Sequence, residues 1–310
     1  MESFQDPKFV LHRTKFFLYI TLQLPAVAIT VLIFAFLLKH RAALKLLQNQ
    51  ALLVLMIINF LELVVDMPMP IHYYYLGYVD PATPGYCTWW TYCEYSLHLI
   101  SELIVATMAI QRHALIFQAN AFHSRLKLFA LYYAPLALCI AYPIILYIGI
   151  IILYPCDGTQ WDYTANLCGY ANCYLVYNKA LGTYDWTNNG LPAIVIFLAN
   201  MLLIMRVVRH RSRLQQGYSW KKQRRMTLQL LSISTLYLIG WVPSLVIGIT
   251  QIFTSPAFLA NIQTDYTLDF MYIMCLFSPW IYIMLLPELT KWIKSSVHRG
   301  RVTTNTAGTT

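Results

Sequence analysis

The chain has 310 residues, of which 58% are hydrophobic and only 11% charged, and its formal net charge is +9. A soluble globular domain usually carries about 25% charged residues, so this composition excludes an ordinary soluble protein. A basic balance is also typical of nucleic-acid-binding proteins. Here, however, the basic residues lie in short loops between long apolar runs, so we expect no nucleic acid among the partners.

Seven apolar runs follow one another along the chain, and each is long enough for a membrane-spanning helix. The sequence therefore predicts an all-α integral membrane protein, a seven-transmembrane helix bundle. We expect an extracellular N-terminus at 1–15, the bundle at 16–286, a short amphipathic helix on the cytoplasmic membrane face at 287–298 and a disordered cytoplasmic tail at 299–310. The predicted spans are Phe16–Leu38, Ala51–Tyr75, Tyr86–Ile110, Leu126–Tyr154, Thr187–Val208, Met226–Thr250 and Thr267–Leu286.

Basic residues predict how the chain is oriented in the membrane. Eighteen of the 22 lysine and arginine residues lie on one side of the seven runs. Because such residues concentrate in cytoplasmic loops, we expect the N-terminus outside the cell and the C-terminus inside, in the plasma membrane. The first run would then act as a retained signal anchor.

Four cysteines lie on the predicted outer side, where disulfides persist: Cys87, Cys156, Cys168 and Cys173. Four cysteines allow three pairings, and the sequence leaves all three open. We favour Cys87–Cys173 with Cys156–Cys168, in which the first bond pins the long loop over the bundle. Three further cysteines lie within spans and are expected to be packed thiols: Cys93, Cys139 and Cys275.

Three motifs fall on the third, sixth and seventh spans. Cys87 and Arg112 are 25 residues apart, about 37 Å of helix, which takes the third span from one membrane surface to the other. The motifs are Gln111-Arg112-His113, Gly240-Trp241-Val242-Pro243 and Ser278-Pro279-Trp280-Ile281-Tyr282. They resemble the acid-Arg-aromatic, Cys-Trp-x-Pro and Asn-Pro-x-x-Tyr motifs of rhodopsin-like G-protein-coupled receptors. Each motif alone is weak, but their order and depth make the resemblance specific.

The resemblance covers roughly residues 15–298 and implies a cell-surface receptor that couples to a heterotrimeric G protein. It also implies that a receptor kinase and arrestin act on the Ser/Thr-rich tail. The basic stretch Arg206–Arg225 would receive the G protein, contact anionic lipid, or do both. The resemblance assigns activation roles to Arg112, Trp241, Pro243, Pro279 and Tyr282.

The chain resembles a divergent member of this family. Gln111 and Gln223 replace two acids that can hold Arg112 in the inactive state, so we expect a weaker lock and raised basal activity. The fourth span lacks the family's tryptophan and has Pro135 and Pro143 instead.

Ionisable residues at membrane depth are costly and mark candidate sites. Asp66 resembles the family's buried aspartate, and with Ser101, Trp241 and Ser278 it would form a sodium site. The alternative is a polar network that holds no ion. Glu62, one turn away, competes with Asp66 for this role.

Glu94 lies near the outer end of the third span, and Tyr272 would face it across the bundle. Together with His98 and Trp241 these residues form the predicted ligand site, which suits a cation. The alternative is a carboxylate whose partner is simply Tyr272 or His98. Aspartates in the predicted outer loops also mildly favour a cationic ligand: Asp80, Asp157, Asp162, Asp185 and Asp265.

The sequence also bears on other functions. A retinal Schiff base needs a lysine in the seventh span, and residues 267–286 contain none, so we expect no retinal. Apart from the sodium ion we expect no cofactor, and we expect no enzymatic activity. A transporter or ligand-gated channel is the alternative from a different class. Peptide, amine and small odorant-like ligands all remain open.

Overall fold

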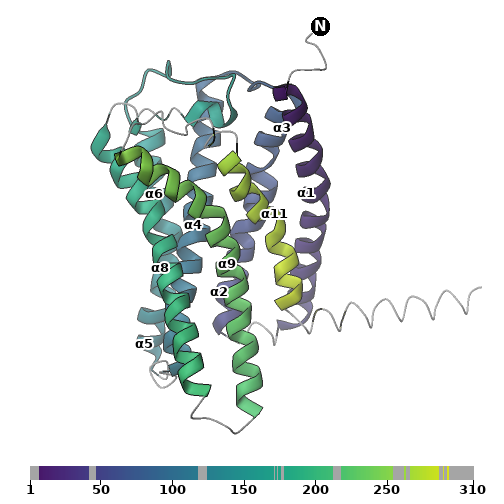
Figure 1. Ribbon diagram of the computed structural model, residues 1–310, viewed down its shortest axis with the longest axis vertical. Coiled ribbons are helices and arrows are strands. Elements are labelled where there is room, and N and C mark those ends of the chain that lie inside the picture. Colours follow the sequence, from purple (N-terminus) through teal and green to yellow (C-terminus); the bar gives the residue numbers. More distant parts are fainter. Residues whose placement is uncertain are drawn as a thin grey trace, which may run out of the picture.

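The computed structural model describes a bundle of helices. Its described residues are 7–41, 47–117, 124–170, 172, 174–175, 178–211, 218–253, 262, 266–285, 289 and 292. Within them the chain forms helices and no strand, which confirms the all-α prediction, and the long helices run side by side (Figure 1). The main elements are α1 (Pro7–Lys39), α2 (Leu47–Leu61), α3 (Pro68–Leu76), α4 (Pro84–Phe117), α6 (Ala134–Tyr147), α8 (Lys179–Arg211), α9 (Tyr218–Phe253) and α11 (Leu268–Leu285).

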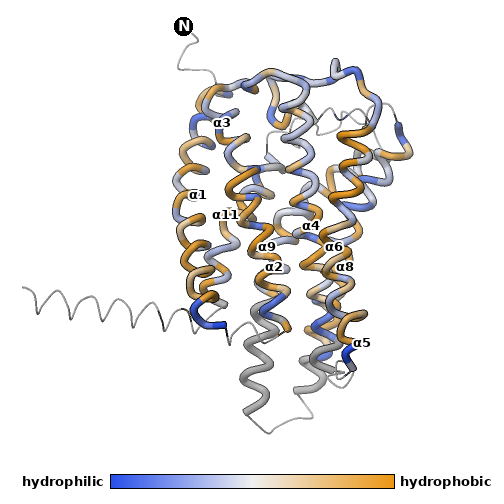
Figure 2. Tube along the Cα trace, turned by 180° about the vertical axis from the view of Figure 1, so that it is seen from behind, coloured by the Kyte–Doolittle hydropathy of each residue, from blue (hydrophilic) through white to orange (hydrophobic). Residues whose placement is uncertain are grey.

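In the described part of the chain, six helical segments are long and apolar enough to cross a membrane. The seventh apolar segment, α11, has 18 residues, about 27 Å of helix. Figure 2 shows apolar residues along the middle of the helices and polar residues toward their ends. Several helices extend beyond the predicted spans: α1 begins at Pro7, and α8 begins at Lys179 rather than at Thr187.

The second apolar segment contains a π-helical turn, η2 (Glu62–Asp66), between α2 and α3. The backbone N–H of Met67 donates to the Glu62 carbonyl, five residues earlier, at 2.9 Å. Pro68 has no N–H, so it cannot bond the carbonyl of Leu63 in the same way. Gln23 of α1 donates its side-chain amide to that carbonyl instead, at 2.7 Å. The turn is therefore held from the neighbouring helix.

The fourth apolar segment is one run of helical elements from residue 125 to 152. It consists of α5 (Arg125–Leu128), the π-helical turn η4 (Phe129–Tyr133), α6 and a second π-helical turn, η5 (Ile148–Ile152). The hydroxyl of Tyr132 in η4 donates to the Leu47 carbonyl and accepts the N–H of Ala51. This one side chain joins the fourth segment to the first turns of α2.

The predicted disulfide pairing is wrong. Cys87, in the first turn of α4, is bonded to Cys168 rather than to Cys173, with their Cα atoms 5.9 Å apart. Cys156 is also disulfide-bonded, so it has a partner other than Cys168. Cys173 itself lies outside the described residues. The three thiols predicted to be free are unpaired and buried: Cys93, Cys139 and Cys275.

The loop conformation explains why Cys168 reaches α4. Leu167, Cys168 and Gly169 have φ angles of 50°, 50° and 76°. These values lie in the left-handed region of backbone conformation, which residues other than glycine rarely adopt. At Gly169 an added Cβ would lie 2.9 Å from the Cβ of Asp162, so only glycine fits there. This tight turn folds the loop back on itself and presents Cys168 to the helix.

Asp185 was expected in an outer loop but lies within α8, where it is buried. Its carboxylate accepts hydrogen bonds from the hydroxyls of Tyr147 at 2.8 Å and Tyr174 at 3.1 Å. The side-chain amide of Asn189, one turn along α8, donates to it at 3.2 Å. Asp185 therefore joins α8 to α6 and to the preceding loop, and it is removed from the outer acidic surface.

Two residues of the predicted amphipathic helix are described. Leu289 is buried, and the ring of the half-buried Trp292 lies 5.7 Å from that of Phe36 and 6.4 Å from that of His40, both near the end of α1. The rest of 287–298, the tail at 299–310, and the side chains of Gln223 and most of Arg206–Arg225 lie outside the described residues.

Replacing Cys168 by serine should lower the free energy of unfolding by about 2–5 kcal/mol, because the bond closes a long loop. Thermal unfolding of the purified protein measures this, with Cys93→Ser as the control that removes a buried free thiol. Non-reducing peptide mapping that recovered Cys87 bonded to any other cysteine would contradict the pairing.

Candidate functional site

A cluster of buried ionisable side chains lies between η2 and α4. It contains three carboxylates, those of Glu62, Asp66 and Glu94, and one imidazole, that of His98. All four residues are at most 3% exposed. Glu94 and His98 are four residues apart on α4, so they lie on one face of that helix. The π-helical turn brings Glu62 and Asp66 to the facing side.

The imidazole of His98 stands at the centre of this acid cluster. Its Nε2 lies 3.1 Å from Oε1 of Glu94, and its Nδ1 lies 3.7 Å from Oε1 of Glu62. Asp66 interacts with both Glu94 and His98. Neither imidazole nitrogen is aligned for a hydrogen bond with another described residue. The ring is therefore surrounded by carboxylates that it does not directly bond.

Helix α11 supplies two further polar groups to the acid cluster. The hydroxyl of Tyr272 donates to Oε2 of Glu94 at 3.3 Å, and the thiol of Cys275 donates to Oε2 of Glu62 at 2.9 Å. Three carboxylates beside one imidazole cannot all carry a charge in apolar surroundings. The acid cluster therefore either shares protons or takes up a cation.

The predicted ligand residues are partly brought together. Glu94, His98 and Tyr272 meet in the acid cluster. Trp241 is buried on α9, and its indole N–H has no hydrogen-bond partner among the described residues.

The residues predicted for sodium are arranged differently from the expectation. The hydroxyls of Ser101 and Ser278 donate to carbonyls of their own helices, those of His98 at 2.9 Å and Met274 at 2.8 Å. The carboxylate that meets the hydroxyl of Ser101 is that of Glu62. Glu62, the competing residue, thus holds the position that the sequence had suggested for Asp66.

A second buried polar contact joins three helices. The side-chain amide of Asn59 on α2 donates to the hydroxyl of Tyr282 on α11 at 2.9 Å. The hydroxyl of Tyr237 on α9 donates to the amide oxygen of Asn59 at 3.1 Å. The sequence reading did not single out Asn59 or Tyr237, although a polar amide within an apolar run was a usable signal.

Arg112 is buried on α4, and its Nη1 has no hydrogen-bond partner among the described residues. Its neighbour Gln111 donates to the carbonyls of Leu131 at 3.2 Å and Tyr132 at 3.1 Å in η4. Pro135 has no N–H to offer the Leu131 carbonyl, which lies four residues earlier. An amide can donate to these carbonyls and an ionised acid cannot, which accounts for glutamine at position 111.

An ion pair that the sequence did not predict connects α1 to α11. Nζ of Lys15 lies 2.7 Å from Oδ2 of Asp269, and both side chains are largely buried. The hydroxyls of Tyr19 and Tyr74 donate to the other carboxylate oxygen of Asp269. The ammonium of Lys15 also lies 5.1 Å from the ring centroid of Tyr74. Lys15 had been counted only as an outer-side basic residue.

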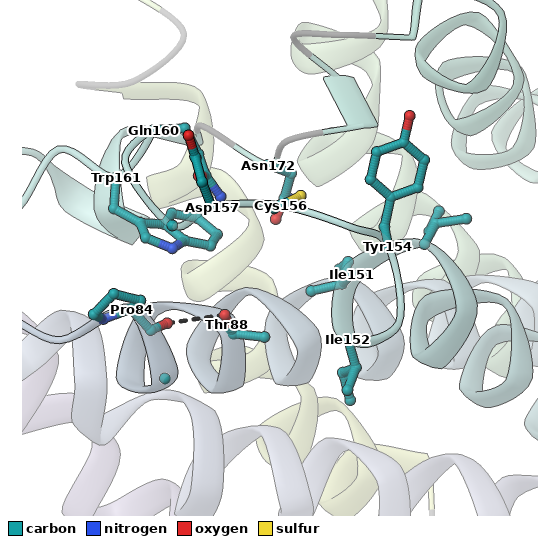
Figure 3. A pocket seen from close by; sticks show the side chains of 13 residues that line it. Pro84, Thr88, Ile151, Ile152, Tyr154, Cys156, Asp157, Gln160, Trp161 and Asn172 are labelled. Carbon is teal, nitrogen blue, oxygen red and sulfur yellow. Dashed lines mark hydrogen bonds between the residues drawn. The ribbon is translucent and has the colours of Figure 1, made fainter.

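A cavity of about 200 Å³ lies between the first turns of α4, the end of η5 and the loop that follows it (Figure 3). Trp161 and Gln160 approach the helix from the loop, opposite Pro84 and Thr88. The cavity shares no residue with the acid cluster.

Three of the remaining outer aspartates lie on loops: Asp80, Asp157 and Asp162. Asp80 is exposed, and Asp265 lies outside the described residues. Hydrogen bonds from the backbone N–H and the hydroxyl of Thr159 lower the pKa of the exposed Asp157 carboxyl. Asp162 accepts the same pair of bonds from Thr164.

Comparison with known proteins identifies the family. The chain matches the model of the family described as "7 transmembrane receptor (rhodopsin family)" over residues 29–282, which extend from α1 to Tyr282. A comparison with curated proteins finds no match. With its six helices long and apolar enough to cross a membrane, the chain therefore belongs to the rhodopsin family of seven-transmembrane receptors and is a multi-pass membrane protein.

Proposed function

We propose that this chain is a cell-surface receptor that transmits the binding of an extracellular ligand to a heterotrimeric G protein. The observation that carries the proposal is the contact of Asn59 with Tyr237 and Tyr282, because one amide holds α2, α9 and α11 in a single arrangement. A receptor needs an element with two stable arrangements, and a ligand that binds one of them more tightly shifts the population toward it.

In this proposal α11 is the seventh span, and the N-terminus lies outside the cell at the plasma membrane. The length of α11, about 27 Å, is close to the thickness of the hydrocarbon core. The excess of basic residues on the opposite side from the N-terminus supports the orientation. The basic stretch Arg206–Arg225 and the Ser/Thr-rich tail are then cytoplasmic, where a G protein, arrestin and a receptor kinase would act.

Activation in this proposal means that the end of α9 nearest the basic stretch moves away from α2 and α11. Pro243 within α9 and Pro279 within α11 are the places where these helices lack a backbone hydrogen bond and can bend. Trp241 is buried two residues before Pro243 in α9. Its side chain would contact a ligand that enters from the extracellular side. When the contact of Asn59 breaks, Tyr282 and Arg112 become free to contact the G protein.

The proposed ligand is a cation that reaches the acid cluster. Glu94 is the carboxylate hydrogen-bonded to Tyr272, and His98 stands beside it. A positive charge there would relieve the repulsion between the carboxylates. The exposed loop aspartates would attract such a ligand toward the bundle.

Arg112→Ala should abolish basal nucleotide exchange on the G protein in membranes, at equal surface expression. The reason is that no acid among the described residues holds the guanidinium of Arg112, so it can turn to the G protein once the helices move apart. Arg13→Ala is the control, because Arg13 stacks on Phe9 and Tyr75 near the start of α1. Equal exchange by wild type and Arg112→Ala would remove Arg112 from the coupling machinery.

Tyr237→Phe should raise basal exchange about fivefold, since it removes one hydrogen bond of about 1 kcal/mol that holds α9 to α2. The matched control is Tyr142→Phe, which removes a hydroxyl that bonds Tyr184 and Asn188 elsewhere in the bundle. Unchanged exchange in Tyr237→Phe would show that the contact with Asn59 does not restrain the receptor.

Glu94→Gln should weaken activation by amine agonists about 10–100-fold, because it removes the counter-charge of the ammonium. Dose–response curves of amines found by screening measure this. Glu102→Gln is the control, since Glu102 is an equally buried acid of α4 that contacts the backbone of Ala193 on α8 instead. Potent activation by an anionic compound, insensitive to Glu94→Gln, would rule out the cation proposal.

A further inference from the structure

The acid cluster contains a donor set, two carboxylates and one imidazole, that also suits a transition metal ion. One oxygen of Asp66, one oxygen of Glu94 and one nitrogen of His98 lie within 4.8 Å of one another, and all three residues are buried. We propose that Asp66, Glu94 and His98 bind a zinc ion between η2 and α4. The inference concerns the same carboxylates as the cation site proposed above, but it does not depend on coupling to a G protein.

The distances fit a metal centre after small side-chain movements. Two ligands that each lie about 2.0–2.1 Å from a tetrahedral zinc ion are about 3.3 Å apart. Nε2 of His98 and Oε1 of Glu94 are 3.1 Å apart, already close to that separation. The third ligand, from Asp66, lies within 4.8 Å of both and needs a rotation of its side chain.

The orientation of the donors also indicates a shared target. Among the described residues, neither nitrogen of His98 makes a hydrogen bond, whereas the carboxyls of Asp66 and Glu94 lie close enough to share one with each other. Buried polar atoms normally have partners, so unpartnered ones that converge on one point require an explanation. His98 approaches Glu94 without pointing at it, as two ligands of one ion do.

Glu62 and Tyr272 lie behind the proposed ligands His98 and Glu94. In metal sites, such neighbouring groups orient the ligands through hydrogen bonds. Oε1 of Glu62 lies 3.7 Å from Nδ1 of His98, so this carboxylate can accept the Nδ1 proton while Nε2 binds the metal. The hydroxyl of Tyr272 donates to the second oxygen of Glu94. Tyr272 already holds Glu94, and a shift of a few tenths of an ångström would bring Glu62 within hydrogen-bond distance of His98.

Charge and donor type together favour zinc. A divalent ion with two carboxylates and a neutral imidazole is a neutral unit, which removes the cost of two buried negative charges. Calcium takes a larger set of oxygen ligands than this site offers, and magnesium binds carboxylates and water rather than imidazole. Imidazole with carboxylates suits zinc. Three protein ligands leave a fourth position for a water molecule or a donor atom of another ligand.

Metal binding by the purified full-length chain in lipid nanodiscs tests the proposal. Cobalt(II), which takes zinc sites and absorbs visible light, should bind with a one-to-one ligand-field spectrum, and zinc should displace it. Zinc at about 100 times its dissociation constant should raise the unfolding midpoint by about 5 °C, and magnesium should leave it unchanged. A wild-type chain with neither signal would overturn the proposal.

Variants locate the site. Asp66→Asn and His98→Gln should each weaken cobalt binding at least about 100-fold. Glu102→Gln, which removes a buried carboxylate of α4 outside the acid cluster, should bind as wild type does. Glu62→Gln should weaken binding about 10–100-fold, as the loss of an outer partner does.

Wild-type affinity in Asp66→Asn and His98→Gln would place the metal elsewhere and overturn the proposal. If those two variants fail to fold, Glu62→Gln decides: unchanged affinity overturns the proposal. Loss of receptor signalling with intact cobalt binding would count against the proposed function alone, so the two failures can be told apart.

Discussion

The structure depends on one constraint: between helices whose outer faces are apolar, a polar group must find its partner within the protein. Prolines make this demand acute, because each removes a donor and leaves a carbonyl unbonded. Gln23 bonds the Leu63 carbonyl near Pro68, and Gln111 bonds the Leu131 carbonyl near Pro135. In both cases the replacement donor comes from the adjacent helix. The irregular turns therefore also fasten α1 to the second segment and α4 to the fourth.

A buried charge needs partners even more than a neutral polar group does. The carboxylate of Asp269 is paired with a lysine and accepts hydrogen bonds from two tyrosines. The carboxylate of Asp185 accepts hydrogen bonds from two tyrosines and an asparagine. The acid cluster is not partnered in this way, since His98 is the one basic side chain within it. A structural role would be better served by a carboxylate with a full set of donors. The incomplete partnering around His98 thus sets the acid cluster apart from Asp185 and Asp269 and makes it the candidate site.

Sequence reasoning predicted the features that depend on local composition. Apolar runs located the spans, and helical spacing placed Glu94 opposite Tyr272 and left Cys93, Cys139 and Cys275 as free thiols. Sequence reasoning failed where the position of a residue depends on contacts with another helix or loop. The π-helical turn that turns Glu62 inward is held by Gln23 on α1, and the choice of Cys168 depends on three left-handed residues in a loop. Asp185 looked like a loop acid because its tyrosine partners come from residues 38 and 11 positions away.

The ion pair of Lys15 with Asp269 closes the ring of helices by joining the first to the last. Because Asp269 begins α11, a load on the N-terminal helix is carried directly into the helix that holds Pro279 and Tyr282. In mechanical terms the N-terminus is a lever on that helix. An antibody or a tether that pulls on residues near Pro7 would load α11 through this ion pair and α3 through the contact of Arg13 with Tyr75. The pair thus provides an entry for force that is independent of the acid cluster.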